Sequence, residues 1–397
     1  MSSSRQILSW VAGLLAALLV GPAARSQEAP IVVGATVSRS GAQAALADGY
    51  GKGLLLWQDE VNAAGGLLGR RVEVRLRDDR SQAVRARAEY EKLVEEKADV
   101  LIGPYGSAAT MMGAAVAERA RRVMVNGAGP ARTVHQRAPQ YLFQSVIPYA
   151  SYGAGVLEMA KAAGIERLFI LGRDDPRSRD MAEATAELGR AQGFAAVEMV
   201  SYTGGSADFE LQVKLARAAG AQAWIAFGEV REAADMVRTF KRLDYAPQLF
   251  FARAAAEPAF VDLLGQDAEF SLGAMEYDAR LATPGNEAFA KAYAARWAEP
   301  AGVSAAQGYA AATVLAAALR EAGSLESQKL RAALTRLEIG TVLGPYRIDP
   351  ANGSQAGMRA TVAQILRGRP AVVWPRELET ANVLLPYPQW GERSLLK

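Results

Sequence analysis

Short apolar runs alternate with amphipathic segments along most of the chain. The first strands predicted are the apolar runs Ile31–Thr36, Val100–Ile102 and Val123–Asn126, together with Arg71–Arg77, which alternates apolar and charged residues as an edge or half-exposed strand does. Segments with helical periodicity follow the first three of these strands in chain order, beginning with a helix from about Asp48 to Ala64. Short buried runs followed by segments of helix length are typical of parallel strands joined by crossover helices. The pattern therefore predicts an α/β fold with a doubly wound parallel sheet.

The same alternation resumes after Pro148 and predicts a second, similar lobe. The helices expected there are 149–163, 178–192, 206–219, 230–243, 285–298, 305–322 and 325–337. The strands expected there are 167–172, 195–200, 223–228, 248–252, 270–275, 341–348, 360–366 and 371–373. Three helices follow the main run of strands, and no Gly/Ser linker separates the halves. We therefore expect the chain to pass between the lobes more than once.

A strand, a turn and a helix are predicted within Ala98–Ala120. Gly103 and Pro104 end the strand, and Ser107 then stands at the expected N-cap, as Ser81 does before the preceding helix. Unpaired N–H groups at a helix start suit a carboxylate, so Ser107 is a candidate anion-binding residue. The alternative is that Ser107 only caps its own helix.

Residues 1–26 have the pattern of a cleaved signal peptide. A polar start with Arg5 precedes the apolar run Ile7–Val20, and small residues follow it up to Ser26. No later stretch reaches 18 uninterrupted apolar residues. Because the sequence contains no Cys, a lipid-anchoring cysteine, disulfides and thiolate metal ligands are excluded. We expect a periplasmic protein without a lipid anchor.

Charge and length narrow the class of protein further. The 45 Lys and Arg residues and 42 Asp and Glu residues leave a net charge of +1 once the two signal-peptide arginines are removed. This balance gives no case for a nucleic-acid partner or an anionic membrane surface. A mature chain of this length is most simply two domains, and without an obvious exposed apolar patch we expect a monomer.

Signatures of catalysis are weak. His135 is the only histidine and has no triad spacing, and the chain has neither a phosphate-binding loop nor a complete dinucleotide fingerprint. The pairs Asp78-Asp79 and Asp174-Asp175 lie at strand ends, where Asp is commonly a turn or capping residue. We therefore expect no cofactor, no metal and no enzymatic activity.

Polar and aromatic residues gather at the carboxyl ends of the predicted strands, where open α/β sheets bind ligands. The candidate ligand-binding residues are Tyr105, Ser107, Asn126, Ala128 and Gly129 in the first half, and Arg177, Glu229, Arg253 and Tyr277 in the second. No pair among them combines a nucleophile with a base, so the set fits a binding protein better than an enzyme.

These motifs together resemble the periplasmic substrate-binding proteins of ATP-driven transporters, in the Leu/Ile/Val-binding family. The resemblance is carried by IVVGATVSRSG, VNAAGGLLGRRVEVRLRDD, EKLVEEKADVLIGPYGSAAT, VMVNGAGPARTV, ILGRDD, YTGGSADF and LGPYRID. It implies the type I fold, with two lobes joined by crossings near 144–148, 275–280 and 344–349. It also implies a first lobe of 27–147 and 279–346, and a second of 148–278 and 347–397.

The resemblance further implies that Ser107 holds a ligand carboxylate and that Ala128 supplies a carbonyl. The expected threonine is replaced by Pro130, an aromatic residue is missing near Arg177, and the expected acidic partner of an ammonium falls on Ala254. Two interpretations stay open. Glu229 takes the ammonium partner's place, or Arg177 and Arg253 hold an acidic group of a ligand without an amine.

The function implied is delivery of a small carboxylate, an amino acid or a related organic acid, to the permease of an ABC transporter. In this interpretation Tyr105 and Tyr277 cover the apolar part of the ligand. The alternatives are an exported ligand-sensing protein that feeds a membrane sensor, and an exported α/β enzyme.

Overall fold

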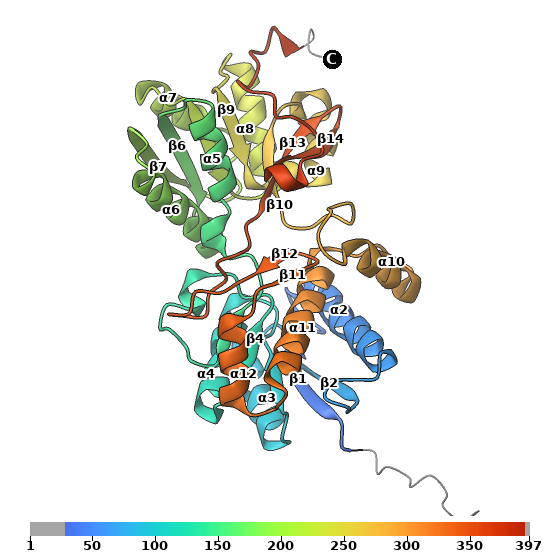
Figure 1. The fold of residues 1–397 in the computed structure, drawn as a ribbon. Coiled ribbons are helices and arrows are strands. Elements are labelled where there is room, and N and C mark those ends of the chain that lie inside the picture. Colours follow the sequence, from blue (N-terminus) through green and yellow to red (C-terminus); the bar gives the residue numbers. More distant parts are fainter. Residues whose placement is uncertain (1–27, 394–397) are drawn as a thin grey trace, which may run out of the picture.

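A computed structural model describes residues 28–393 and divides them into two α/β lobes, one above the other in Figure 1. The predicted signal peptide, residues 1–26, lies outside the described residues. Lobe 1 is built on a five-stranded sheet and lobe 2 on a seven-stranded sheet, and a two-stranded sheet lies between them. Within residues 28–393, no helix has the length and apolar character needed to span a membrane.

The sheet of lobe 1 is entirely parallel and has the order β2-β1-β3-β4-β5. Its strands are β1 (Ile31–Val37), β2 (Val72–Asp78), β3 (Val100–Ile102), β4 (Met124–Asn126) and β5 (Leu142–Gln144). The helices of this lobe are α2 (Ala44–Ala63), α3 (Ala83–Glu95), α4 (Ser107–Ala120), α11 (Val303–Ala322) and α12 (Ser327–Arg336).

Alternate residues of β1 enter different hydrophobic cores. Ile31 and Val33 pack with residues of α2, α11 and α12, whereas Val32 packs with residues of α3 and α4 on the other face. Side chains of a strand point alternately to the two faces of a sheet, so both faces of this sheet are buried. This burial explains why β1, β3 and β4 are short apolar runs, whereas the edge strand β2 alternates apolar and charged residues.

The sheet of lobe 2 is mixed, with the order β14-β13-β10-β9-β8-β6-β7. Its parallel strands are β6 (Arg167–Arg173), β7 (Ala196–Tyr202), β8 (Ala223–Phe227), β9 (Leu249–Ala252) and β10 (Leu272–Met275). The antiparallel additions are β13 (Thr361–Leu366) and β14 (Arg369–Trp374). The helices are α5 (Ala154–Ala162), α6 (Pro176–Ala191), α7 (Glu210–Ala218), α8 (Val230–Arg242) and α9 (Pro258–Leu264). The predicted α/β class with doubly wound sheets is confirmed.

Several predicted elements differ from the structure. The strand expected over 341–348 is a hairpin of β11 (Ile339–Thr341) and β12 (Gly344–Tyr346). The helix expected over 149–163 starts as a 3-10 turn, Tyr149–Ser151, and becomes α-helical only at Ala154. The prediction of Ser81 as an N-cap is wrong, because its hydroxyl donates to the carbonyl of Ser40 at 2.7 Å and Gln82 is the N-cap instead.

The chain passes between the two large sheets three times. The first passage follows β5 and the second follows β10, which leads to α10 (Asn286–Trp297). The third comes later than the 344–349 segment expected from the resemblance. The N–H of Gln355 donates to the side chain of Gln144 in β5 at 3.2 Å, so the chain leaves lobe 1 only between Gln355 and Thr361. The domain boundaries stay a prediction.

Helices α2 and α11 approach so closely that glycine is required where they meet. A methyl group added at Gly308 would lie 2.2 Å from the carbonyl oxygen of Tyr50, and backbone cannot move aside as a side chain can. We expect Gly308→Ala to lower the free energy of unfolding by ~1–3 kcal/mol, because overpacking outweighs the helix propensity gained. Chemical denaturation measures the change. Gly391→Ala, with no atom near the added methyl, is the control, and equal stability of the two variants would contradict the packing argument.

Candidate ligand-binding cleft

A cleft of about 1180 Å³ lies between the lobes. Of the candidate residues predicted from the sequence, Tyr105, Ser107 and Ala128 line it from lobe 1, and Arg177, Glu229 and Arg253 line it from lobe 2. Asn126, Gly129 and Tyr277 are not part of its lining. The loops at the carboxyl ends of both sheets therefore face one shared space, as open α/β folds require of a ligand site.

The lobe 1 wall is formed by the start of α4. The prediction of Ser107 as the N-cap is wrong, because Gly106 occupies that position with a φ of 94°, and Ser107 is the first helical residue. Its hydroxyl oxygen accepts a hydrogen bond from the N–H of Ala131 at 3.1 Å. Among residues 28–393, the first N–H of α4 that donates a backbone hydrogen bond is that of Thr110, to the carbonyl of Gly106. The backbone N–H groups before Thr110 are thus the ones that a helix leaves for an anionic ligand.

Asn126 and Gly129 shape this wall from behind. The Asn126 side chain is fully buried, accepts a hydrogen bond from the N–H of Gly129 at 2.7 Å and donates one to its carbonyl at 2.8 Å. A side chain at Gly129 would meet the hydroxyl of Thr110 at 2.5 Å. Both residues therefore fix the path of the loop that carries Ala128 and Ala131.

His135 is engaged in the same buried region. Its Nδ1 lies 3.0 Å from the carbonyl oxygen of Asn352, and burial lowers its pKa against the opposing effect of that hydrogen bond. Among residues 28–393, no group of three or more His, Cys, Asp or Glu side chains is arranged to hold a metal ion.

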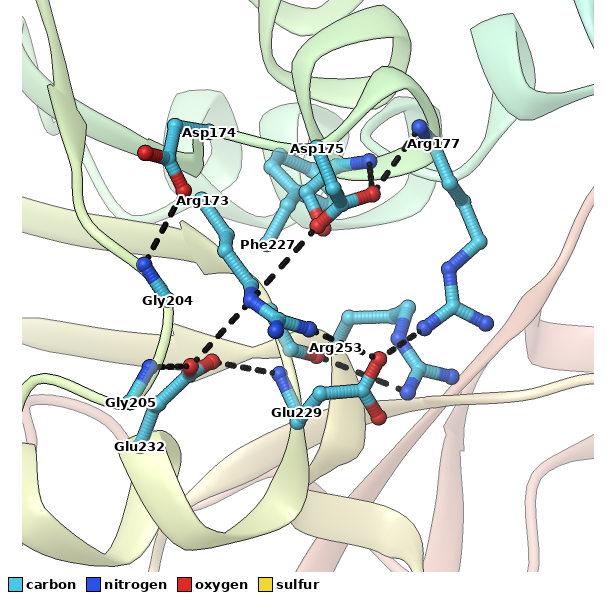
Figure 2. A network of polar contacts seen from close by, with 12 residues as sticks. Arg173, Asp174, Asp175, Arg177, Gly204, Gly205, Phe227, Glu229, Glu232 and Arg253 are labelled. Atoms are coloured by element: carbon cyan, nitrogen blue, oxygen red, sulfur yellow. Dashed lines mark hydrogen bonds and ion pairs between the residues drawn. The ribbon is translucent and has the colours of Figure 1, made fainter.

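The lobe 2 wall is a network of alternating charges, drawn in Figure 2. Arg177 forms an ion pair with Glu229, whose carboxylate also lies 3.5 Å from Arg173. The buried carboxylate of Glu232 lies 3.3 Å from the Nε of Arg173 and accepts a hydrogen bond from the N–H of Gly205 at 2.7 Å. The charges of this network hold one another in place.

The aspartates of this wall are structural, as the sequence analysis favoured. Asp175 is the N-cap of α6 and accepts hydrogen bonds from the N–H groups of Arg177 and Ser178, each at 3.0 Å. Burial acts to raise the pKa of Asp175, but these hydrogen bonds and the adjacent arginines outweigh it and lower the pKa. Asp174 accepts a hydrogen bond from the N–H of Gly204. In the pair Asp78-Asp79 of lobe 1, Asp79 plays the same kind of role, because it accepts hydrogen bonds from the hydroxyls of Thr36 and Ser38.

Arg253 is nine-tenths buried and is held by its own neighbours. Its guanidinium donates to Glu257 at 2.8 Å, one helical turn later, and approaches the carbonyl oxygen of Gly228 at 3.5 Å. The side chain therefore enters the cleft already neutralised by a carboxylate.

Several lining residues were missed by the sequence analysis. Tyr149, Tyr152 and Glu276 lie in or beside the passages between the lobes and line the cleft. Tyr277, which was predicted instead of its neighbour Glu276, packs edge-to-face on Phe289 with 6.1 Å between ring centroids. The position of Glu276 directly after a strand could have identified it as a candidate. The prediction chose the next residue, Tyr277, which does not line the cleft.

One arginine of lobe 1 reaches across the cleft to lobe 2. The Arg132 guanidinium forms ion pairs with Asp180, with Glu187 at 2.8 Å and with Glu183 at 3.3 Å. The three carboxylates follow one another along one face of α6, at the spacing of helical turns. We name this contact the Arg132 bridge.

The fold and the two-walled cleft define a two-lobed binding protein, and the sequence comparisons agree. The pattern of the periplasmic binding protein family matches residues 30–370, so the chain belongs to that family. Its members are substrate-binding proteins of transporters rather than enzymes.

The individual proteins compared below share a quarter or less of their aligned residues with this chain. An amino acid binding protein of Pseudomonas aeruginosa is 25% identical over 221 residues, which cover 54% of this chain and 58% of that protein. The match thus spans less than two thirds of the relative's length. The structure also resembles a branched-chain amino acid transporter substrate binding protein of Streptococcus pneumoniae in complex with isoleucine (TM-score 0.66, 21% identity, 90% and 100% of the two chains). A solute binding protein of R. palustris in complex with benzoate is similar too (TM-score 0.65, 19% identity, 89% and 98%).

Removal of the Arg132 bridge is expected to favour separation of the lobes. Three partly exposed ion pairs contribute on the order of 1 kcal/mol together, and salt screens them. We expect Arg132→Gln to increase the radius of gyration of the ligand-free protein in low salt, measured by small-angle X-ray scattering. Arg179→Gln is the control, because Arg179 lies on the same cleft but forms no ion pair within residues 28–393. Identical scattering from wild type and both variants would refute the bridge.

Proposed function

We propose that this chain is an exported solute-binding protein that delivers a small carboxylate ligand, an amino acid or a related organic acid, to an ABC-type uptake transporter. The single observation that carries the proposal is the cleft whose walls come from different lobes, with the start of α4 on one side and the charged network on the other. The predicted signal peptide supports the periplasmic location, and we propose that the protein acts as a monomer.

In this proposal Ser107 and the first N–H groups of α4 bind the ligand carboxylate. A helix start offers both unpaired donors and a partial positive charge, and hydrogen bonds to a charged group are stronger than neutral ones. Asn126 and Gly129 hold the facing loop, while Arg177, Glu229 and Arg253 present polar groups from lobe 2.

Closure follows from where these groups lie. A ligand held between the walls contacts both lobes only when they approach, so it favours the closed state by its difference in affinity for the two states. Hinge closure around a ligand is a known behaviour of periplasmic binding proteins. A micromolar ligand supplies about 8 kcal/mol in total, well above the contribution of the Arg132 bridge. The closed state then presents surfaces of both lobes to the permease.

Replacement of the Ser107 hydroxyl tests the carboxylate anchor. A thermal-shift panel of branched-chain amino acids, amides, and aliphatic and aromatic acids identifies a stabilising compound, and titration calorimetry measures its affinity. We expect Ser107→Ala to weaken binding at least ~10-fold, the effect of losing a hydrogen bond to a charged group. Ser206→Ala is the control, since its hydroxyl donates only within a turn of lobe 2. Unchanged affinity in Ser107→Ala would show that the carboxylate binds elsewhere.

A further inference from the structure

A buried glutamine without a hydrogen-bond partner lines the cleft. Gln307, in the second turn of α11, is 7% exposed, and its Oε1 accepts no hydrogen bond from the described residues. Its Nε2 donates none within residues 28–393 either, so the carboxamide is unpaired in either of its two orientations. A buried polar group without a partner is costly, and folded proteins leave few of them. The position of this side chain therefore needs a cause.

The other unpaired buried atoms of the cleft differ from those of Gln307. Arg173, Asp175 and Arg253 each leave one such atom, but each of these side chains is also held by an ion pair. Lobe 2 itself therefore fixes their places. Gln307 comes from lobe 1 and has no polar contact in the part of the chain that the structure describes. A molecule that enters the cleft, water or ligand, is what pairs its carboxamide.

A line of contacts along lobe 1 connects Gln307 to the start of α4. The next residue, Gly308, lies so close to Tyr50 that an added methyl group would be 2.2 Å from the Tyr50 carbonyl oxygen. The ring of Tyr50 packs edge to face on Tyr105, with 6.0 Å between their centroids. Tyr105 lines the cleft two residues before Ser107. Tyr105 thus links the proposed carboxylate anchor to the region of Gln307.

A neutral carboxamide selects a particular kind of partner. Its oxygen needs an N–H or O–H donor and its nitrogen donates to an oxygen, so a hydroxyl or a second carboxamide satisfies both atoms. An ionised carboxylate has no proton to donate, and an alkyl group leaves both atoms unpaired. The neighbouring lining is less polar, because Tyr105 presents a ring and Leu46 is 46% exposed. This side of the cleft therefore suits an apolar segment that ends in an uncharged polar group.

We propose that Gln307 forms a polar subsite, which binds a hydroxyl or carboxamide group at the end of the ligand remote from its carboxylate. This inference rests on the proposed function and defines the ligand as a small carboxylate with an apolar middle and an uncharged polar far end. Tyr105 covers the apolar middle. A ligand with an alkyl end leaves Gln307 unpaired, and a site built to hydrogen-bond a ligand group rejects the analogue that lacks it.

Matched pairs of compounds test the polar subsite. Glutamine and norleucine, γ-hydroxybutyrate and valerate, and para-hydroxybenzoate and para-toluate share a carboxylate but differ in whether the far end is polar or methyl. We expect the wild-type protein to bind the polar member of at least one pair ~10-fold or more tightly, by titration calorimetry. We expect Gln307→Met, which keeps the length of the side chain, to abolish this preference by weakening only the polar member.

The ligand-free protein supplies a second measurement. Replacing a buried polar group that has no partner by an apolar group of similar shape is nearly neutral or stabilising. We therefore expect Gln307→Met to leave the midpoint of chemical denaturation unchanged or raised. A lowered midpoint in both Gln307→Met and Gln307→Leu would show that the carboxamide stabilises the chain by itself, and would overturn the inference.

The matched control is Gln192→Met. Gln192, at the end of α6, also has a buried Oε1 without a partner among residues 28–393, but it does not line the cleft, so its replacement leaves the preference unchanged. If no polar member is preferred, or if Gln307→Met weakens both members of a pair equally, the polar subsite is wrong while the proposed function stands. If no carboxylate in the panel binds to the wild-type protein, the proposed function fails and this inference fails with it.

Discussion

The common direction of the strands within each lobe is the constraint on which the cleft depends. Parallel strands joined by crossover helices bring their following loops to one edge of the sheet. The loops after β3 and β4 therefore meet in lobe 1, and those after β6 and β8 meet in lobe 2. Because the passages between the sheets are short, the two edges face each other. Side chains as distant in sequence as Ser107 and Arg253 can then contact one small molecule.

The two walls differ in how they are prepared for a ligand. The lobe 1 wall offers backbone N–H groups held by a buried side chain, Asn126, and needs no rearrangement to meet an anion. The lobe 2 wall offers charges that already satisfy one another, such as Arg177 with Glu229. Partly exposed pairs of this kind contribute about 1 kcal/mol or less, so a ligand exchanges them at small cost. In the proposed function, lobe 1 therefore anchors the ligand and lobe 2 adapts to it.

The sequence predicted the architecture well because both sheets are buried on both faces, which produces runs such as Val100–Ile102 that are hard to mistake. It missed β5, in which the polar Gln144 leaves only two apolar residues, and α9, whose seven residues are too few to show a helical period. In the cleft, strand ends located Ser107 and Arg177, but their partners depend on tertiary contacts. Asn126 lies at the right strand end and turns toward Gly129, and Glu276 directly follows a strand, but only the tertiary structure shows that Glu276 lines the cleft and Tyr277 does not.

The three passages between the sheets have a mechanical consequence. Two bodies joined by one flexible tether can bend, twist and slide independently, whereas three short tethers in a row restrict them mainly to rotation about a single axis. The hairpin of β11 and β12 lies beside these passages, between the lobes (Figure 1). With such a joint, different bound molecules all produce the same kind of change, a change in the angle between the two lobes. In the proposed function, a permease that recognises this angle needs no contact with the ligand itself.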